Sequence, residues 1–182
     1  NQMKEQGKLK DNTIVATVMS NLGFFLMGKE QGIHIEQTKV GDRYVLERML
    51  EIGANLGGEQ SGHIIFLDEN TTGDGLLSAL HLLQVMVDTG KPLSELSKIM
   101  TVLPQALVGA KVPNHKKDSY MEYTEIAEAI ARVSAKFEGE GRVLIRPSGT
   151  EPLVRVMIEG KDQEMIEKEA KALAELIQNV ML

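Results

Sequence analysis

The sequence predicts an α/β fold: a mixed, mostly parallel sheet with flanking helices, followed by a small α+β C-terminal domain. In the first hundred or so residues, short apolar runs alternate with segments of helical apolar spacing, which is typical of layered α/β proteins. Near Leu103-Pro104 the order changes to strand, helix, two strands and a final helix, and 182 residues accommodate two small domains. We therefore expect an α/β domain over 1–103, a linker and first strand over 104–112, and an α+β domain over 113–182.

The first domain contains three predicted strands: Thr13–Met19, which is a short and nearly continuous apolar run, Ile33–Thr38 and Ile64–Leu67. Four helices are expected between and after them. The first runs from Ser20 or Asn21 to Gly28, the second from a capping Asp42 to Gly53, the third from Thr72 or Asp74 to about Asp88, and the fourth from Pro92 to about Met100. The third helix is so rich in Leu and Val that we expect it to be buried.

The second domain begins with a predicted strand over Val108–Val112. A helix follows, whose apolar residues recur at helical spacing: Tyr123, Ile126, Ile130, Val133 and Phe137. Two strands, Arg142–Ile145 and Leu153–Ile158, flank a polar turn. Asp162 is expected to cap a last helix with the apolar stripe Ile166, Ala170, Leu173, Ile177 and Val180.

Composition and charge exclude several classes of protein. The chain carries 20 Lys and Arg against 26 Asp and Glu, so a net charge of −6 disfavours nucleic acid and anionic membranes as partners. Without cysteine there is no disulfide, thiolate metal site or Cys nucleophile. No apolar run reaches the ~18 residues of a membrane span, and Asn1–Asp11 lacks the features of a signal peptide. We expect a cytoplasmic protein, and a start without Met inside the helix-like stretch Gln2–Gly7 indicates a fragment.

The turn after residue 145 has the composition of a phosphate site. Arg146, Ser148, Gly149 and Thr150 combine a guanidinium fork, two hydroxyls and a residue that tolerates φ > 0, and Arg155 follows. This set suits a phosphate monoester. The alternative is an ordinary β-hairpin turn, because the same residue types are common in turns.

A second polar cluster lies in the loop Gly57–His63, where Glu59, Ser61 and His63 offer paired donors and acceptors to sugar hydroxyls. The loop precedes its predicted strand, so the rule that ligands bind after the carboxyl ends of strands does not apply directly. The alternative is a glycine-rich connection. Lys39, between a strand and a helix, could attract a phosphate or be a solvated charge.

No metal site is predicted in this chain. The segment Asp68–Asp74 imitates the start of a calcium loop, but Ala79 occupies the position of the bidentate Glu. The four histidines are scattered along the chain.

Four motifs together resemble the α-D-phosphohexomutase family over nearly the whole chain: TKVGDRYV (38–45), GGEQSGHIIF (57–66), NTTGDG (70–75) and RPSGTEPLVRV (146–156). Their order and separations make the resemblance specific. The form GEQSGH is most similar to the bacterial members that act on glucosamine phosphates. The family has four domains, and this chain resembles the third, truncated at its N-terminus, and the fourth.

The resemblance implies roles for individual residues. Glu59, Ser61 and His63 would contact the sugar, with His63 near the transfer site and Lys39 near the reacting phosphate. The non-reacting phosphate would be held by a larger set: Arg146, Ser148, Gly149, Thr150 and Arg155. The family's phosphoserine and Mg²⁺ loop match nothing here, so the N-terminal domains of the same chain would supply them.

The implied reaction interconverts glucosamine 6-phosphate and glucosamine 1-phosphate through a phosphoserine and a bisphosphate, with a sugar bisphosphate as activator. It feeds UDP-N-acetylglucosamine and peptidoglycan synthesis, and we expect the fragment alone to be inactive. Two alternatives stay open: a phosphomannomutase or phosphoglucomutase, and a non-catalytic phosphosugar-binding module. The sequence also leaves a homodimer open.

Overall fold

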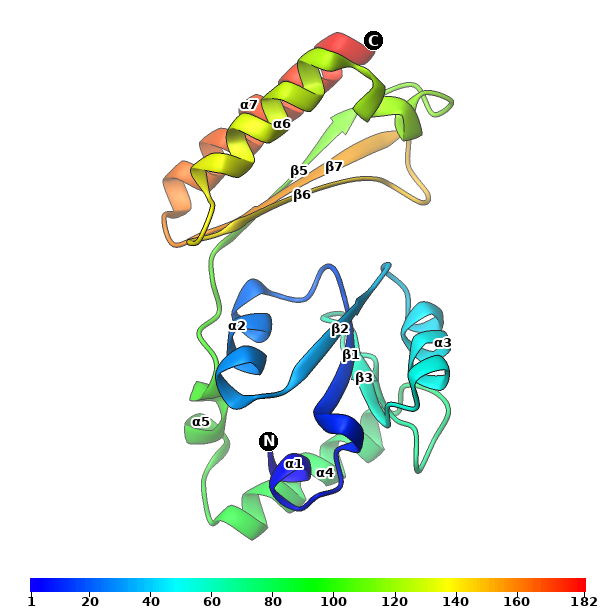
Figure 1. Cartoon of the computed structure of the whole chain (residues 1–182), viewed down its shortest axis with the longest axis vertical. Helices are drawn as coiled ribbons and strands as arrows, with labels where there is room; N and C mark the ends of the chain where they lie inside the picture. The colour runs from blue at the N-terminus through cyan, green and yellow to red at the C-terminus, as the bar shows by residue number, and fades with distance from the viewer. The chain divides into compact units, whose positions relative to one another are not determined.

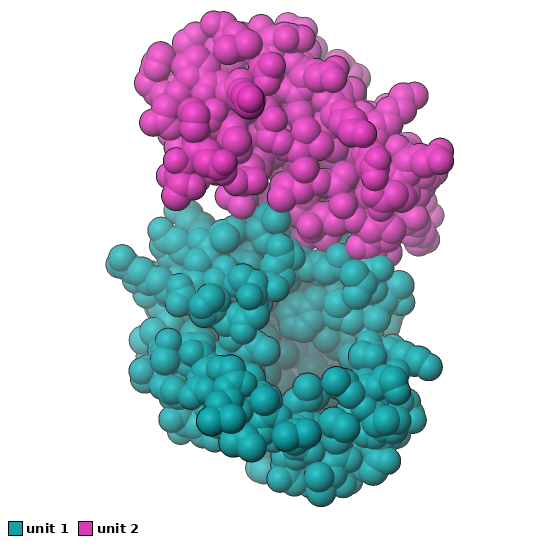
Figure 2. Space-filling model, turned by 180° about the vertical axis from the view of Figure 1, so that it is seen from behind, with its two compact units in different colours: residues 1–102 teal, residues 103–182 magenta.

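The chain divides at Val102 in the computed structural model, which describes all residues from 1 to 182. Unit 1 comprises residues 1–102 and unit 2 residues 103–182, coloured separately in Figure 2. In no part of the chain is there a helix long and apolar enough to cross a membrane. Each unit has its own sheet and its own apolar core.

Unit 1 is built on a four-stranded sheet with the strand order β2-β1-β3-β4. The strands are β1 (Thr13–Thr17), β2 (His34–Thr38), β3 (Leu56–Gly58) and β4 (Ile64–Phe66). β2 and β3 flank β1 in parallel, and β4 is antiparallel to β3. The predicted mixed, mostly parallel sheet is therefore confirmed.

The helices of unit 1 lie on both faces of this sheet (Figure 1). They are α1 (Gln2–Glu5), α2 (Leu22–Gln31), α3 (Asp42–Ile52), α4 (Gly75–Thr89) and α5 (Leu93–Leu96), with 3-10 turns η1 (Lys10–Asn12) and η2 (Ser97–Ile99). Val45 and Met49 of α3 pack on Val15 and Ile65 from one face. On the other face, Phe24 of α2 and Met3 of α1 pack near Ile14.

Strand β3 is absent from the elements predicted by the sequence, which placed a polar turn at Gly57. The segment Leu56–Gly58 has only three residues, two of them glycines that disfavour strands, so its local signal is weak. Pairing with β1 and packing under α3 make it a strand. Gly57 is required there, because an added Cβ would lie 2.8 Å from Cγ1 of Val45 and also collide with Met49.

Two predictions about helix starts were right and one was wrong. The Asn21 side chain accepts a hydrogen bond from the Gly23 amide at 3.0 Å. The Asp74 side chain likewise accepts one from the Leu77 amide at 3.0 Å, so both residues cap their helices. Asp42, however, is the first helical residue, and the cap position belongs to Gly41 at φ 134°, a conformation that favours glycine.

The expected burial of the third helix is wrong, because α4 has no buried residue. It meets the sheet mainly through His81, whose ring stacks on Phe66 with centroids 3.9 Å apart and whose Nε2 lies 2.7 Å from Glu69 Oε1. Residues Leu76, Leu80, Leu83 and Val87 remain 55–76% exposed. Apolar content indicates that a helix needs a partner, and this chain does not contain one for most of α4.

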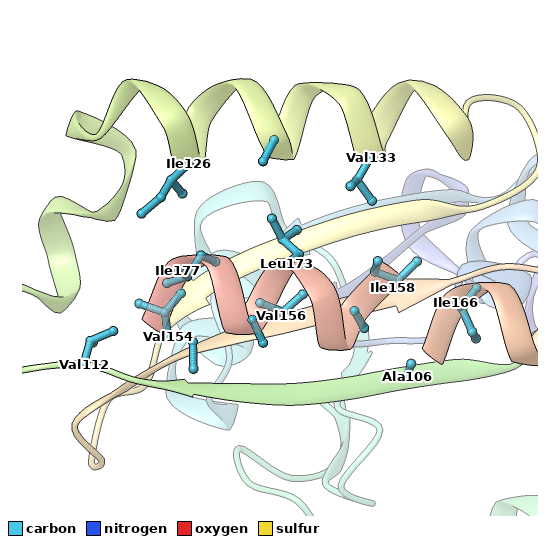
Figure 3. Close-up of a cluster of buried hydrophobic side chains, with 14 of the residues drawn as sticks. Ala106, Val112, Ile126, Val133, Val154, Val156, Ile158, Ile166, Leu173 and Ile177 are labelled. Carbon is cyan, nitrogen blue, oxygen red and sulfur yellow. The ribbon is translucent and has the colours of Figure 1, made fainter. Parts of the chain in front are cut away.

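Unit 2 is a three-stranded antiparallel sheet of order β5-β7-β6, with two helices packed on one face (Figure 1). Its elements are β5 (Gln105–Lys111), η3 (Lys117–Glu122), α6 (Thr124–Lys136), β6 (Arg142–Pro147), β7 (Leu153–Glu159) and α7 (Gln163–Met181). Figure 3 shows Ile126 and Val133 of α6 and Leu173 of α7 in the same buried cluster as Val156 and Ile158 of β7. Asp162 caps α7 through the Met165 amide, as predicted.

Candidate phosphosugar site

Three loops in unit 1 leave the same edge of the sheet. Because β1, β2 and β3 are parallel, their carboxyl ends at Thr17, Thr38 and Gly58 meet there. Ligands of open α/β sheets bind at this edge. Without β3, the Glu59 loop would only precede a strand; with β3 in place, the loop follows the carboxyl end of a parallel strand and the rule applies.

The structure joins the Lys39 segment to the Glu59 loop. The Gly41 amide donates to Glu59 Oε2 at 3.0 Å, across 18 residues of sequence. Glu59 is half-buried and Lys39 is exposed. The carboxylate therefore anchors the start of α3 with one oxygen, while its second oxygen can still accept a hydrogen bond from a ligand.

The loop itself is a tight turn between β3 and β4. The Glu59 amide donates to the His63 carbonyl at 2.9 Å, and the Gly62 amide donates to the Glu59 carbonyl at 3.1 Å. Gly62 has φ 101°, which favours glycine. Ser61 Oγ lies 3.2 Å from Nδ1 of His63, and both side chains are exposed. The three predicted sugar contacts thus lie on one exposed turn.

The TTGDG segment supports this turn, a role that the sequence analysis did not predict. A Cβ added to Gly73 would approach the His63 ring to 3.2 Å and its Cβ to 3.3 Å. Asp74, the cap of α4, connects the same segment to β4, because its backbone amide donates a hydrogen bond to the Ile64 carbonyl at 3.4 Å. In the sequence, Gly73 is the one residue that indicates this role, because only glycine permits the close approach of His63.

In unit 2, the turn between β6 and β7 gathers positive charge. Arg146 and Arg155 are directly opposite each other in the strand register. Arg155 pairs with Glu151, whereas the buried Nε of Arg146 has no hydrogen-bond partner. Burial and the nearby Arg155 charge both lower the pKa of Arg146. An uncompensated guanidinium of this kind calls for an anion.

Ser148 is buried at the start of the turn and organises it. Its amide donates to the Leu153 carbonyl at 2.9 Å, and its Oγ accepts from the Glu151 amide at 3.3 Å, which leaves the hydroxyl proton available to a ligand. Gly149 and Thr150 are exposed at the tip. The turn does not use the φ > 0 that Gly149 permits, since its φ lies outside that region, and a Cβ there would meet nothing within 4 Å.

Lys117 of η3 is a site residue that the sequence analysis missed. Its Nζ donates to the Ser148 carbonyl at 2.7 Å, and the Tyr120 hydroxyl of the same segment donates to the Ile145 carbonyl at 3.1 Å. Lys117 therefore holds the backbone of the turn at Ser148. Nothing local in the sequence predicts this contact across 31 residues.

No group of three or more His, Asp or Glu side chains in residues 1–182 is placed to hold a metal ion. The donor set of this chain therefore does not fit a bound Mg²⁺.

Comparison with known proteins decides the family. A sequence model described as phosphoglucomutase/phosphomannomutase, alpha/beta/alpha domain III matches residues 1–103. A second, described as phosphoglucomutase/phosphomannomutase, C-terminal domain, matches residues 82–176. The chain belongs to the phosphoglucomutase/phosphomannomutase family.

Relatives within this family include phosphoglucosamine mutases of bacteria. That of Caldicellulosiruptor bescii is 61% identical over 177 residues, covering 97% of this chain and 39% of the relative. That of Clostridium novyi is 61% identical over 176 residues, with the same coverage. The chain thus spans about two fifths of the length of these relatives and corresponds to their C-terminal part.

Solved structures of other phosphohexomutases share the fold. N-acetylphosphoglucosamine mutase of Aspergillus fumigatus matches with a TM-score of 0.78 at 19% identity, covering 96% of this chain and 39% of that one. An N-acetylglucosamine-phosphate mutase solved in its substrate complex matches with a TM-score of 0.74 at 24% identity, covering 91% and 38%. The family resemblance drawn from the four motifs is confirmed.

Proposed function

We propose that this chain is the substrate-binding C-terminal part of a phosphoglucosamine mutase, which interconverts glucosamine 6-phosphate and glucosamine 1-phosphate. The observation that carries the proposal is the uncompensated Arg146 guanidinium, placed opposite Arg155 and next to the Ser148 turn. Two guanidinium groups, a free hydroxyl proton and the exposed tip at Gly149 and Thr150 match the donors that a phosphate monoester accepts.

The loop of Glu59, Ser61 and His63 is proposed to bind the sugar. It lies at the carboxyl edge of a parallel sheet and presents a carboxylate, a hydroxyl and an imidazole on one turn. The carboxylate favours an amino sugar, which carries a cation when protonated. Phosphoglucosamine mutase relatives at 61% identity support the same substrate.

Two parts of the proposed chemistry are assigned to the rest of the full-length protein. Phosphoryl transfer needs an in-line nucleophile and neutralisation of the transferred charge. We propose that the rest of the full-length protein supplies a phosphoserine and Mg²⁺, that a sugar bisphosphate is both intermediate and activator, and that the product feeds UDP-N-acetylglucosamine and peptidoglycan synthesis. Aspergillus relatives were solved with glucose 1,6-bisphosphate, and with GlcNAc-6P and magnesium.

Within this scheme the residues of this chain bind and orient the substrate. The Arg146 turn would hold the phosphate that is not reacting, while Lys39 and His63 would stand on the side of the phosphate being transferred. Because the bisphosphate must present either end, the sugar loop has to accept two orientations. The side chains of Ser61 and His63 are exposed, which suits that requirement.

Substitution of Arg146 in the full-length protein tests the proposal. Arg146→Ala should weaken binding of glucosamine 6-phosphate by about 1.5–3 kcal/mol, because a charge-assisted pair is lost. Isothermal titration calorimetry gives the dissociation constant. Arg132→Ala is the matched control. Arg132 is 67% exposed on α6, so this substitution removes the same charge at a different surface position. Equal affinity in the two variants would contradict the phosphate assignment.

A further inference from the structure

The turn between β6 and β7 contains a single acidic residue, Glu151, in an otherwise neutral stretch from Ser148 to Pro152. The Glu151 amide donates to Ser148 Oγ at 3.3 Å, and the Glu151 carbonyl accepts from the Leu153 amide at 2.9 Å. Both hydrogen bonds hold the backbone of Glu151 inside the turn. Its carboxylate is therefore a fixed part of the surroundings that a bound phosphate would meet.

This carboxylate already occupies one of the two arginines. Glu151 Oε2 forms an ion pair with Nη2 of Arg155, whereas the buried Nε of Arg146, directly opposite Arg155 in the strand register, has no hydrogen-bond partner. A guanidinium carries five N–H donors, so Arg155 keeps donors for a second anion. Arg155 can thus be shared between Glu151 and a phosphate, while Arg146 has no such competitor.

Stability does not account for a carboxylate at this position. The side chains of Arg155 and Glu151 are 29% and 50% exposed, and ion pairs that are open to solvent contribute little to folding. For phosphate binding the carboxylate is unfavourable, because a phosphate monoester carries a charge of about −1.5 to −2 at neutral pH and like charges repel. A glutamine would have nearly the same size without this repulsion.

We propose that Glu151 is an internal competitor of the substrate phosphate, which shares Arg155 with that phosphate and keeps the affinity of the turn low. The inference rests on the proposed function, in which the bisphosphate presents either end and the turn must therefore release one phosphate and take up the other. Differences in affinity at one site arise mostly from the rate of release. Glu151 thus sets that rate through Arg155 and is a positioning residue.

Binding of inorganic phosphate to the 182-residue chain tests the sign of this effect. Glu151→Gln should lower the dissociation constant about threefold to tenfold, because the competing charge is removed while the side chain keeps its length. The amide signals of Ser148 and Gly149 report binding in an NMR titration. If Glu151 merely supported the turn, the same substitution would loosen the site and raise the dissociation constant.

Glu128→Gln is the matched control. Glu128 is 66% exposed on α6 and lies four residues before its partner Arg132, the same spacing as Glu151 and Arg155, so the variant removes the same charge from a similar pair. Its dissociation constant for phosphate should stay within about twofold of the unsubstituted chain. Glu151→Ala is a second variant, which should also bind phosphate more tightly than the unsubstituted chain.

The titration separates this inference from the phosphate assignment itself. Signals of the turn that do not respond to phosphate in the unsubstituted chain would contradict the assignment and the inference with it. Binding by the unsubstituted chain, with equal or weaker binding by both Glu151 variants, would overturn the inference alone.

Steady-state kinetics of the full-length protein test the role in release. Glu151→Gln should lower the KM for glucosamine 6-phosphate about threefold to tenfold and lower kcat at least about twofold, because a phosphate that is held more tightly leaves more slowly. A purely structural role would raise KM instead. A lower KM with an unchanged or higher kcat would overturn the release role of Glu151.

Discussion

At the scale of single residues, charge balance around Ser148 carries the functional argument. Arg146 and Arg155 are opposite each other beside one turn, Arg155 pairs with Glu151, and Lys117 donates to the Ser148 carbonyl within the turn. The two arginines and the serine could be predicted from sequence because they share one motif. Lys117 could not, since its role depends on the packing of η3 against the end of β6, across 31 residues.

Replacing Lys117 separates its positioning role from general stability. Lys117→Met keeps the aliphatic stem but removes the donor to the Ser148 carbonyl. We expect the KM for glucosamine 6-phosphate in the full-length protein to rise about threefold to tenfold, which corresponds to one hydrogen bond, with kcat less affected. Lys117→Arg should restore most of the affinity. Steady-state kinetics measure both parameters, and an unchanged KM would remove Lys117 from the site.

Glu59 offers a test of sugar preference. Glu59→Gln keeps an oxygen that can accept from the Gly41 amide, so the loop anchor survives while the charge is lost. Catalytic efficiency should fall about tenfold more for glucosamine 6-phosphate than for glucose 6-phosphate, because only the amino sugar carries a cation. A parallel decline for both substrates would assign Glu59 to the shared hydroxyls.

At the scale of elements, the sequence predicts most helix starts and misses the shortest strand. Asn21, Asp74 and Asp162 identify caps because a side-chain oxygen satisfies a free amide within three residues, which is a local effect. Strand β3 depends on pairing with β1, more than 40 residues away, so no local pattern reveals it. Missing it also hid the position of the sugar loop at the ligand-binding edge.

The close packing of β3 under α3 gives a stability prediction. Gly57→Ala should lower the free energy of unfolding by about 1–3 kcal/mol, because the new methyl group collides with Met49 and lies 2.8 Å from Cγ1 of Val45. Gly75→Ala, at the start of α4, is the control. It should leave the free energy of unfolding unchanged, since a Cβ there meets no atom within 4 Å. Urea unfolding followed by circular dichroism measures both, and equal stabilities would argue against the β3 packing.

At the scale of the molecule, each unit has an apolar core of its own. The core of unit 2 could be predicted from apolar spacing, and Ile126, Val133, Ile166 and Ile177 are buried as their periodicity requires. The exposure of α4 could not, because a sequence pattern shows that a helix face is apolar without showing whether its partner lies within the same 182 residues.

The chain by itself should unfold cooperatively yet show no mutase turnover. In the proposed scheme the nucleophile and the metal come from the rest of the full-length protein, and phosphoryl transfer depends on both. A coupled assay with glucosamine 6-phosphate, Mg²⁺ and a sugar bisphosphate should stay at background, and adding the N-terminal part of the protein should raise it. Turnover by the purified chain alone would show that the catalytic groups lie in this part of the protein.

The central claim is that the Arg146 turn binds the phosphate of a phosphosugar and that the Glu59 loop binds its sugar. A crystal structure of the full-length protein with glucosamine 6-phosphate tests it most directly. We predict that the phosphate accepts hydrogen bonds from Arg146, Ser148 and Arg155 while the sugar contacts Glu59, Ser61 or His63. A phosphate bound away from Arg146, or a sugar that leaves Glu59 in contact with Gly41 alone, would contradict the account.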